Sequence, residues 1–568
     1  FGTNGSANTP VGAAGVSDTA NAIEIQTINS EERIVVVGST GNDFAVVRYK
    51  PDGTLDSTFD TDGIVITSIR SSVDTANGVA IQRSNNKIVV AGMSRSDLGG
   101  GSFNDDFALA RYNTDGTLDV TFDTDGKVTT NISAVDAARD VVIQEIDGLS
   151  KIVAGGISMR PWPYHDFTLV RYNDNGAVDT TFGTNGRALT AIGAYEDQIH
   201  ALALQPDNKI VAAGFARTGM TNINPDFALA RYNADGSLDT SFGSCGKIIT
   251  AIAAANGSDF AYGVAVQPDG KVIAAGHTQQ GVSNDDVAVL RYMPRGSSAS
   301  PTSIDFDGDG RSDVAVYRAG SGNWYINSTC ASPKSVSFGT AGDRIVPADY
   351  DGDGQTDFAV FRSGVWYISR SSNNTIFAQQ FGLADDIPVT GDYDGDNKAD
   401  IAVFRPSNGY WYVSNSSNGA LQAVELGTEG DLPVPADYNG DGTTEFAVFR
   451  PSNATWYTSP DPANNYGAQQ FGQEGDVPVQ GDYDGDGKAD LAVFRPSTGT
   501  WYLQQSTAGL RAAQFGLSTD QPVAGDYDGD GKNDLAVFRS GAWYISNSAG
   551  GTRTVQWGAS DDLPVAAR

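Results

Sequence analysis

The feature that most constrains the fold is an internal repeat of about sixty residues in the first half of the chain. An Arg-Tyr pair ends a strand-like run five times, at intervals of 63, 60, 60 and 60 residues. Each unit holds four such runs, as at 64–68, 78–83, 87–92 and 107–113, separated by Gly or polar clusters. Four short antiparallel strands in a repeated unit predict a propeller blade. The five pairs are Arg48-Tyr49, Arg111-Tyr112, Arg171-Tyr172, Arg231-Tyr232 and Arg291-Tyr292.

The two ends of this region complement each other. A turn and a Leu-Asp-x-x-Phe pattern, such as Leu118-Asp119 with Phe122, follow the Arg-Tyr pair, but the last unit lacks this segment. The chain opens with its final part, Phe1-Gly2-Thr3-Asn4-Gly5. We therefore expect the amino terminus to complete the last blade and close a five-bladed propeller over residues 1–293. Because the chain starts inside a motif, we also expect a processed product that has lost its leader.

This first region resembles the delta-60 repeat family of bacterial surface proteins across all five units. The resemblance implies a β-propeller, and it brings no defined chemistry with it. Residues 294–302 have the composition of a linker, rich in Pro, Gly and Ser.

The repeat length then changes, because acidic loops begin at Asp305, Asp349, Asp392, Asp437, Asp482 and Asp526, 43 to 45 residues apart. Each loop reads Asp-x-Asp-x-Asp-x-x-x-Asp with small variations. Carboxylates at positions 1, 3, 5 and 9, with the backbone carbonyl at position 7, can surround one hard cation, and Gly at position 6 permits the sharp turn. The candidate ligands are Asp305, Asp307, Asp309, Arg311, Asp313, Asp349, Asp351, Asp353, Gln355, Asp357, Asp392, Asp394, Asp396, Lys398, Asp400, Asp437, Asn439, Asp441, Thr443, Glu445, Asp482, Asp484, Asp486, Lys488, Asp490, Asp526, Asp528, Asp530, Lys532 and Asp534.

The loops are not EF-hands, since position 12 is Val in all six and a strand-like run follows where an EF-hand has a helix. They resemble the FG-GAP/VCBS repeats of integrin-α-like propellers over residues 303–568, and this resemblance implies calcium, about six ions in all. The fourth loop departs most, with Asn439 and Glu445. The third has Asn397 at position 6, where Asn tolerates the backbone that Gly would adopt. The last unit stops where a seventh loop would start, so we expect its end to close a six-bladed ring.

Two further sets of residues recur once per unit in this second region. We expect both to be structural: the Trp residues to pack between blades rather than form a sugar-binding surface, and the Arg and Asp residues to pair rather than form a charged ligand ring. The Trp set is Trp324, Trp366, Trp411, Trp456, Trp501 and Trp543. The charged sets are Arg318, Arg362, Arg405, Arg450, Arg495 and Arg539 with Asp343, Asp386, Asp431, Asp476, Asp520 and Asp562.

The net charge of −32 argues against nucleic acid and anionic membranes as partners. No apolar run is long enough to insert into a membrane. Magnesium fits the loops less well than calcium, because it prefers a small rigid octahedron with several waters. The two cysteines, Cys245 and Cys330, leave open a bridge between the halves or two unpaired thiols.

No catalytic motif stands out. The three histidines are scattered without zinc spacing, and there is no Gly-x-Ser-x-Gly elbow or phosphate loop. We therefore expect a secreted or cell-surface protein that acts in adhesion, scaffolding or surface assembly by binding protein or polysaccharide, with homo- or hetero-assembly open. The alternative is a carbohydrate-active enzyme, or a subunit of one. The non-repeated insertions at 94–105 and 157–165, the latter with Trp162 and Tyr164, are where a unique site would lie.

Overall fold

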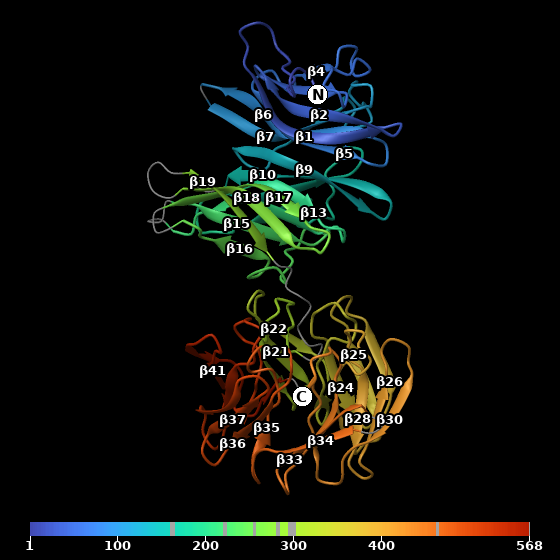
Figure 1. Cartoon of the computed structure of the whole chain (residues 1–568), viewed down its shortest axis with the longest axis vertical. Helices are drawn as coiled ribbons and strands as arrows, with labels where there is room; N and C mark the ends of the chain where they lie inside the picture. Colours follow the sequence, from blue (N-terminus) through green and yellow to red (C-terminus); the bar gives the residue numbers. More distant parts are fainter. Residues whose placement is uncertain are drawn as a thin grey trace. The chain divides into compact units, whose positions relative to one another are not determined.

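The computed structural model describes residues 1–100, 102–159, 165–219, 224–253, 257–279, 285–292, 303–461 and 465–566. The expected linker at 294–302 lies outside the described residues. The chain divides into a first unit, Phe1–Pro294, and a second unit, Arg295–Arg568 (Figure 1). Within the described residues all regular structure is β, in antiparallel sheets of four strands with one of three. The all-β class and the four-stranded antiparallel sheets are confirmed, and the exact numbers of blades, five and six, stay predictions.

In its described part the first unit consists of five sheets, each built from strands that follow one another in the chain. Four sheets have four strands, and the last, β17–β18–β19, has three among the described residues. The strands are β1 (Asp18–Ile28), β2 (Glu31–Thr40), β3 (Asp43–Tyr49), β4 (Ile64–Thr67), β5 (Asp74–Gln82), β6 (Lys87–Gly99), β7 (Ser102–Tyr112), β8 (Lys127–Thr130), β9 (Asp136–Ile146), β10 (Leu149–Met159), β11 (His165–Tyr172), β12 (Arg187–Thr190), β13 (Asp197–Leu204), β14 (Ile210–Ala216), β15 (Asp226–Tyr232), β16 (Lys247–Thr250), β17 (Ser258–Val266), β18 (Val272–Gln279) and β19 (Asp285–Tyr292).

The cores of the first unit lie between successive sheets. Side chains alternate along a strand, so in β6 the residues Ile88 and Val90 pack against the preceding sheet while Val89 and Ala91 pack against the following one. A strand buried on both faces is apolar throughout, which explains runs such as Lys87–Gly92.

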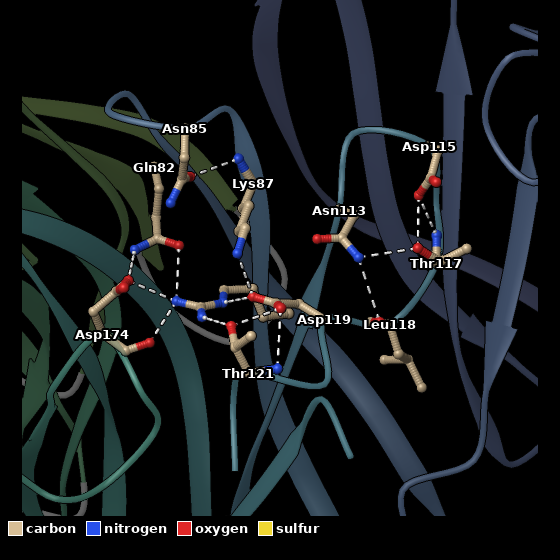
Figure 2. Close-up of polar contacts among 11 residues, drawn as sticks. Gln82, Asn85, Lys87, Asn113, Asp115, Thr117, Leu118, Asp119, Thr121 and Asp174 are labelled. Atoms are coloured by element: carbon tan, nitrogen blue, oxygen red, sulfur yellow. Dashed lines mark hydrogen bonds and ion pairs between the residues drawn. The ribbon is translucent and has the colours of Figure 1, made fainter. Parts of the chain in front are cut away.

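The recurring Arg and the Leu-Asp-x-x-Phe segment form one buried unit of structure. Arg111 is 1% exposed, its Nε lies 2.7 Å from Asp119, and its guanidinium lies 4.8 Å from the ring centre of Phe122. Lys87 reaches the same carboxylate, and Gln82 contacts Asp174 of the next unit (Figure 2). A buried charge is costly unless it is paired. The Arg and the Asp must therefore recur together in each unit, which explains the repeated pattern.

The closure expected for the first unit is not present among the described residues. Residues 1–9 lie on the first sheet, where Gly2 N donates to Asp52 O at 2.7 Å and Tyr49 Oη donates to Thr9 Oγ1 at 2.8 Å. No fourth strand is paired with β19 in the described part of the chain. Ile23 of β1 and Val287 of β19 are 64% and 87% exposed, so among the described residues the first and last sheets do not cover each other.

The second unit has six four-stranded sheets in its described part. Its last strand pairs with its first, because Leu563 and Pro564 lie opposite Tyr317 and Val316. The strands are β20 (Val314–Arg318), β21 (Asn323–Asn327), β22 (Lys334–Ser337), β23 (Arg344–Ile345), β24 (Phe358–Arg362), β25 (Val365–Ser369), β26 (Ile376–Gln380), β27 (Ile387–Pro388), β28 (Ile401–Arg405), β29 (Tyr410–Ser414), β30 (Leu421–Glu425), β31 (Leu432–Pro433), β32 (Phe446–Arg450), β33 (Thr455–Asp461), β34 (Asn465–Gln470), β35 (Val477–Pro478), β36 (Leu491–Arg495), β37 (Thr500–Gln505), β38 (Gly509–Gln514), β39 (Gln521–Pro522), β40 (Leu535–Arg539), β41 (Ala542–Ser546), β42 (Thr552–Gln556) and β43 (Leu563–Pro564).

Both structural expectations for the repeated residues of the second unit are confirmed. The six Trp side chains are at most 1% exposed, and each indole N–H donates to a backbone carbonyl, as from Trp411 to Leu426 O at 2.8 Å. All six Arg residues form two-bonded pairs with the Asp predicted for them, such as Arg405 with Asp386. The Trp side chains are thus used in packing, and the Arg and Asp side chains in pairing.

Candidate metal loops

The six acidic loops are joined to one another by backbone hydrogen bonds, and we call them the loop ring. In each loop the N–H at position 8 donates to the carbonyl of position 1 in the preceding loop, and the first loop donates to the sixth. The bonds, all 2.6 or 2.7 Å, are Thr356 to Asp305, Ala399 to Asp349, Thr444 to Asp392, Ala489 to Asp437, Asn533 to Asp482 and Ser312 to Asp526. The loops therefore form a closed cycle.

The carboxylate at position 1 organises the turn of its own loop. In the fifth loop Asp482 accepts from Gly485 N at 2.6 Å and from Gly487 N at 2.8 Å. Gly487 at position 6 has φ +83°, and Asn397 at the same position of the third loop has φ +63°. The expectation that Asn397 would tolerate this backbone is confirmed.

The acid at position 9 is the most buried ligand candidate. Asp490 is 1% exposed and accepts from Tyr483 N at 2.9 Å and from Ser506 N at 2.7 Å. Burial, with the like charge of Asp307, raises the pKa of Asp313 to about 8. Burial likewise raises the pKa of Asp357 and Asp400 to about 6. These groups resist ionisation unless a positive charge compensates them.

The acids at position 3 leave an oxygen unused. In four loops one carboxylate oxygen at this position is buried without a hydrogen-bond partner: Asp351 Oδ1, Asp394 Oδ1, Asp484 Oδ1 and Asp528 Oδ2. In the first loop the buried carboxylate oxygen without a hydrogen-bond partner is Asp313 Oδ1, at position 9. A buried acceptor without a donor is costly, so these oxygens are the ones in the loops that remain available to a further ligand.

Within a loop, several of the predicted ligand side chains lie close together. Carboxylate oxygens lie within 4.8 Å of one another in the groups Asp305/Asp307/Asp313, Asp349/Asp351/Asp353, Asp392/Asp394/Asp400 and Asp437/Asp441/Glu445. Position 7 also supplies an N–H to position 5, as from Lys488 to Asp486 at 3.0 Å. In several loops the carboxylate at position 5 also accepts a hydrogen bond from a Ser hydroxyl, as Asp486 does from Ser506 Oγ at 2.6 Å.

The fourth loop differs from the others. Its Asn439 Nδ2 donates to Asp441 at 3.0 Å and to Glu445 at 2.7 Å, so the amide hydrogens lie between these two carboxylates. No carboxylate oxygen of this loop is among the buried, unpartnered oxygens of the described residues. The two residues that depart from the loop pattern, Asn439 and Glu445, thus form a hydrogen bond with each other.

In the first unit, sequence reasoning missed a grouping of histidines. His200 and His277 are far apart in sequence, yet both contact Tyr262, with ring centres 4.8 and 5.5 Å apart. The three residues occupy β13, β17 and β18. The sequence signal was that one repeat position, Asn in the first two units, is Arg139, His200 and Tyr262 in the later three. Burial lowers the pKa of His200, and its Nδ1 lies 2.9 Å from Ala261 O.

The first insertion, at 94–105, extends β6 and β7 into a hairpin. Asp105 pairs with Arg95 at 2.6 Å, and Asp106 pairs with Arg70. These described residues therefore offer no free carboxylate pair for glycoside hydrolysis. Trp162 and Tyr164 of the second insertion lie outside the described residues.

The comparisons with known proteins confirm both repeat types in the predicted order. A family described as "Domain of unknown function (DUF5122) beta-propeller" matches residues 33–59, 83–122, 150–182, 205–242 and 267–298. A family described as "FG-GAP-like repeat" matches residues 305–360, 392–448 and 482–537. The first region thus carries propeller repeats of the delta-60 kind, and the second carries FG-GAP-like repeats. No curated protein matches the chain.

Among solved structures, a streptogramin B lyase is 9% identical, covering 46% of this chain and 85% of its own, with a TM-score of 0.34. An Agrocybe aegerita lectin structure, described as recognising non-reducing terminal N-acetylglucosamine, is 15% identical, covering 51% and 88%, with a TM-score of 0.33. The BBS1N structure in complex with ARL6DN is 14% identical, covering 46% and 81%, with a TM-score of 0.31. Likeness at this level transfers no function. Among the described residues no helix has the length and apolar character to cross a membrane.

Proposed function

We propose that the loop ring of the second unit binds divalent cations, and that calcium is the ion it fits best. The observation that carries the proposal is the buried carboxylate oxygen without a partner in five of the six loops. Such an oxygen, beside other carboxylates within 4.8 Å, calls for a positive charge rather than a further N–H group.

The donor set is entirely oxygen, which suits a hard cation. Calcium accepts six to eight oxygen ligands in flexible geometry, whereas magnesium demands a rigid octahedron and keeps several waters. Positions 1, 3, 5 and 9 with the carbonyl at position 7 would hold the ion. When bound, it would neutralise carboxylates whose pKa burial now raises, such as Asp305 at about 7.

We further propose that the protein acts outside the cell as a binding or scaffolding component, with protein or polysaccharide partners. Exposed loops in extracellular modules bind calcium with dissociation constants of roughly 10⁻⁴ to 10⁻³ M, so they would stay empty at cytosolic calcium levels. The repeated Trp, Arg and Asp side chains are used in packing and pairing, which leaves no catalytic group among the repeated residues of the described chain. Fractionation of source cells tests the location, and recovery in the cytosol contradicts it.

The binding experiment is calorimetric titration of the full chain with calcium after removal of metal, with magnesium as the comparison ion. We expect calcium binding at millimolar concentrations and a weaker response to magnesium. The variant Asp484→Asn removes the charge whose oxygen is unpartnered in the fifth loop, and it should lose about one equivalent. Asp385→Asn, an exposed Asp outside the loops, is the matched control. Absence of calcium binding, or unchanged stoichiometry in Asp484→Asn, refutes the proposal.

A further inference from the structure

One cavity of the second unit lies between its fourth and fifth sheets, β31–β32–β33–β34 and β35–β36–β37–β38. Its volume of about 420 Å³ is within the range of small-molecule sites, roughly 300 to 1,000 Å³. Polar groups predominate in its lining, and no Lys or Arg is among the described residues that form it. We call it the amide pocket, because three Gln side chains line it. Its lining includes Thr458, Gly467, Gln469, Gln504, Gln505 and Ser506.

The amide pocket exists because the fourth sheet carries a glycine where the other five sheets of the described unit carry a long side chain. Gly467 of β34 lies opposite Thr458 of β33. With no side chain at position 467, the space beside β34 stays open toward the fifth sheet. The residues at the equivalent position of the other sheets are Lys334, Phe377, Gln422, Arg511 and Arg553.

Two further departures from the repeat lie in the same pocket. Thr458 is partly buried and brings a hydroxyl to a position that is otherwise aliphatic, and Gln504 brings an amide to a position that is otherwise shorter. Three changes therefore coincide at one place, where the six sheets are not equivalent. The equivalents of Thr458, each at most 2% exposed, are Ile326, Ile368, Val413, Leu503 and Ile545. Those of Gln504 are Asn327, Ser369, Ser414, Ser459 and Ser546.

The polar side chains of the pocket are not used within the protein. Gln505 is only 7% exposed, yet its amide forms no hydrogen bond with any described residue. The side chains of Thr458, Gln469 and Gln504 likewise have no hydrogen-bond partner in the described part of the chain. A buried amide without a partner is costly. These four groups therefore remain available to a ligand that both donates and accepts hydrogen bonds.

The charges beside the pocket indicate a neutral ligand. Asp490 of the fifth loop lines it, and both oxygens of this carboxylate accept N–H groups, from Tyr483 at 2.9 Å and from Ser506 at 2.7 Å. The Ser506 hydroxyl donates to Asp486 at 2.6 Å, so this wall is fixed to the fifth loop. An anionic ligand would be repelled by the two carboxylates and would meet no cation in the described lining.

We propose that the amide pocket binds one residue of a neutral saccharide. Saccharide hydroxyls donate and accept at neighbouring positions, as the amides of Gln469, Gln504 and Gln505 do, so the two sets of groups can satisfy each other. A polar lining gives an apolar ligand little to bind. The site rests on the binding role proposed above, and it gives the polysaccharide form of that role a location and a ligand class.

The experiment screens the full chain, in millimolar calcium, against an array of neutral and acidic glycans, and then titrates the best neutral glycan calorimetrically. We expect binding of neutral glycans. Gly467→Arg fills the pocket with the side chain that the fifth and sixth sheets carry at this position, so the fold should tolerate it and glycan binding should be lost. Phe377→Arg places the same side chain at the equivalent position of the second sheet and should bind as the unaltered chain does.

Gln504→Ser introduces the residue that four of the other five sheets have, and it should weaken binding about fivefold because one hydrogen-bonding amide is lost. Gly467→Arg and Gln504→Ser should both keep the calcium stoichiometry of the unaltered chain, which reports intact loops. Glycan binding that Gly467→Arg leaves unchanged overturns the pocket assignment while the proposed binding role stands. Binding of acidic glycans alone, or of no glycan, overturns the saccharide assignment and leaves the calcium titration as a separate test.

Discussion

The two units differ in whether their first and last sheets are covered by a neighbouring sheet. The second unit pairs β43 with β20 and links its six loops in a cycle, so each sheet has neighbours on both sides. The first unit leaves one face of β1 and one face of β19 exposed. Repetition therefore determines how neighbouring sheets pack, but closure requires that the two ends also meet. A cyclic array should unfold together, while a linear stack can unfold from its ends.

The largest expected effect comes from removing calcium. Ions that bind only the folded state stabilise it by RT ln(1+[L]/Kd), on the order of 1 kcal/mol per weak site and about 5 kcal/mol over the loop ring. Chelator should therefore lower hydrogen-exchange protection throughout the second unit of the full chain and leave the first unit unchanged. Excess calcium over chelator is the control and should restore protection. An equal loss in both units would contradict the assignment of the ions to the second unit.

The next prediction concerns how far the loss of hydrogen-exchange protection caused by one core substitution extends through each unit. Trp411→Ala and Phe167→Ala each remove a fully buried aromatic, at a cost of about 3 to 5 kcal/mol. In the second unit we expect all six sheets to lose protection together, measured by hydrogen exchange. In the first unit the loss should concentrate in the sheets beside β11. Local loss around Trp411 alone would show that the closed cycle does not unfold as one.

A smaller effect follows from a residue that breaks the repeat. Asp140 stands where the other units have Ala or Gly, and it accepts from Leu202 N and Val141 N at 2.8 Å. Burial raises the pKa of Asp140 to about 6, against an ordinary value of 3.8. The folded state therefore holds this proton more tightly than the unfolded state, and stability falls as pH rises from about 4 through 6.

Asp140→Asn should flatten that fall, gaining on the order of 2 kcal/mol relative to the unaltered chain between pH 4.5 and pH 8. The measurement is hydrogen-exchange protection of β9 and β13 at both pH values. Asp147→Asn, an exposed Asp in the same sheet, should leave the pH dependence unchanged. A parallel pH response in Asp140→Asn and the unaltered chain would show that Asp140 is not the titrating group.

The sequence predicted most of the repeated chemistry and little of the asymmetric part. Trp411 and the Arg405–Asp386 pair could be assigned because each recurs in every unit, and recurrence at one strand position indicates packing. Closure of the first unit was predicted from its complementary ends, but the described residues do not show it, because complementary sequences do not determine whether two ends meet. The convergence of His200 and His277 on Tyr262 was also hidden, since it depends on contacts between sheets rather than on spacing.

The smallest and most specific expected effect is stronger calcium binding at the fourth loop. Asn439 places an amide hydrogen between Asp441 and Glu445, so a cation must turn this amide before its oxygen can face the ion. We expect this to be the weakest of the six sites. Asn439→Asp restores the carboxylate that all five other loops have at position 3 and should strengthen calcium binding there about tenfold, or about 1.4 kcal/mol. Without calcium the same change should destabilise the loop, because it adds a charge beside two acids. Calorimetric titration and chelator-dependent exchange of peptides covering 437–445 measure both signs, with Asn453→Asp outside the loops as control. Equal binding by Asn439→Asp and the unaltered chain would mean that the fourth loop already binds as the others do.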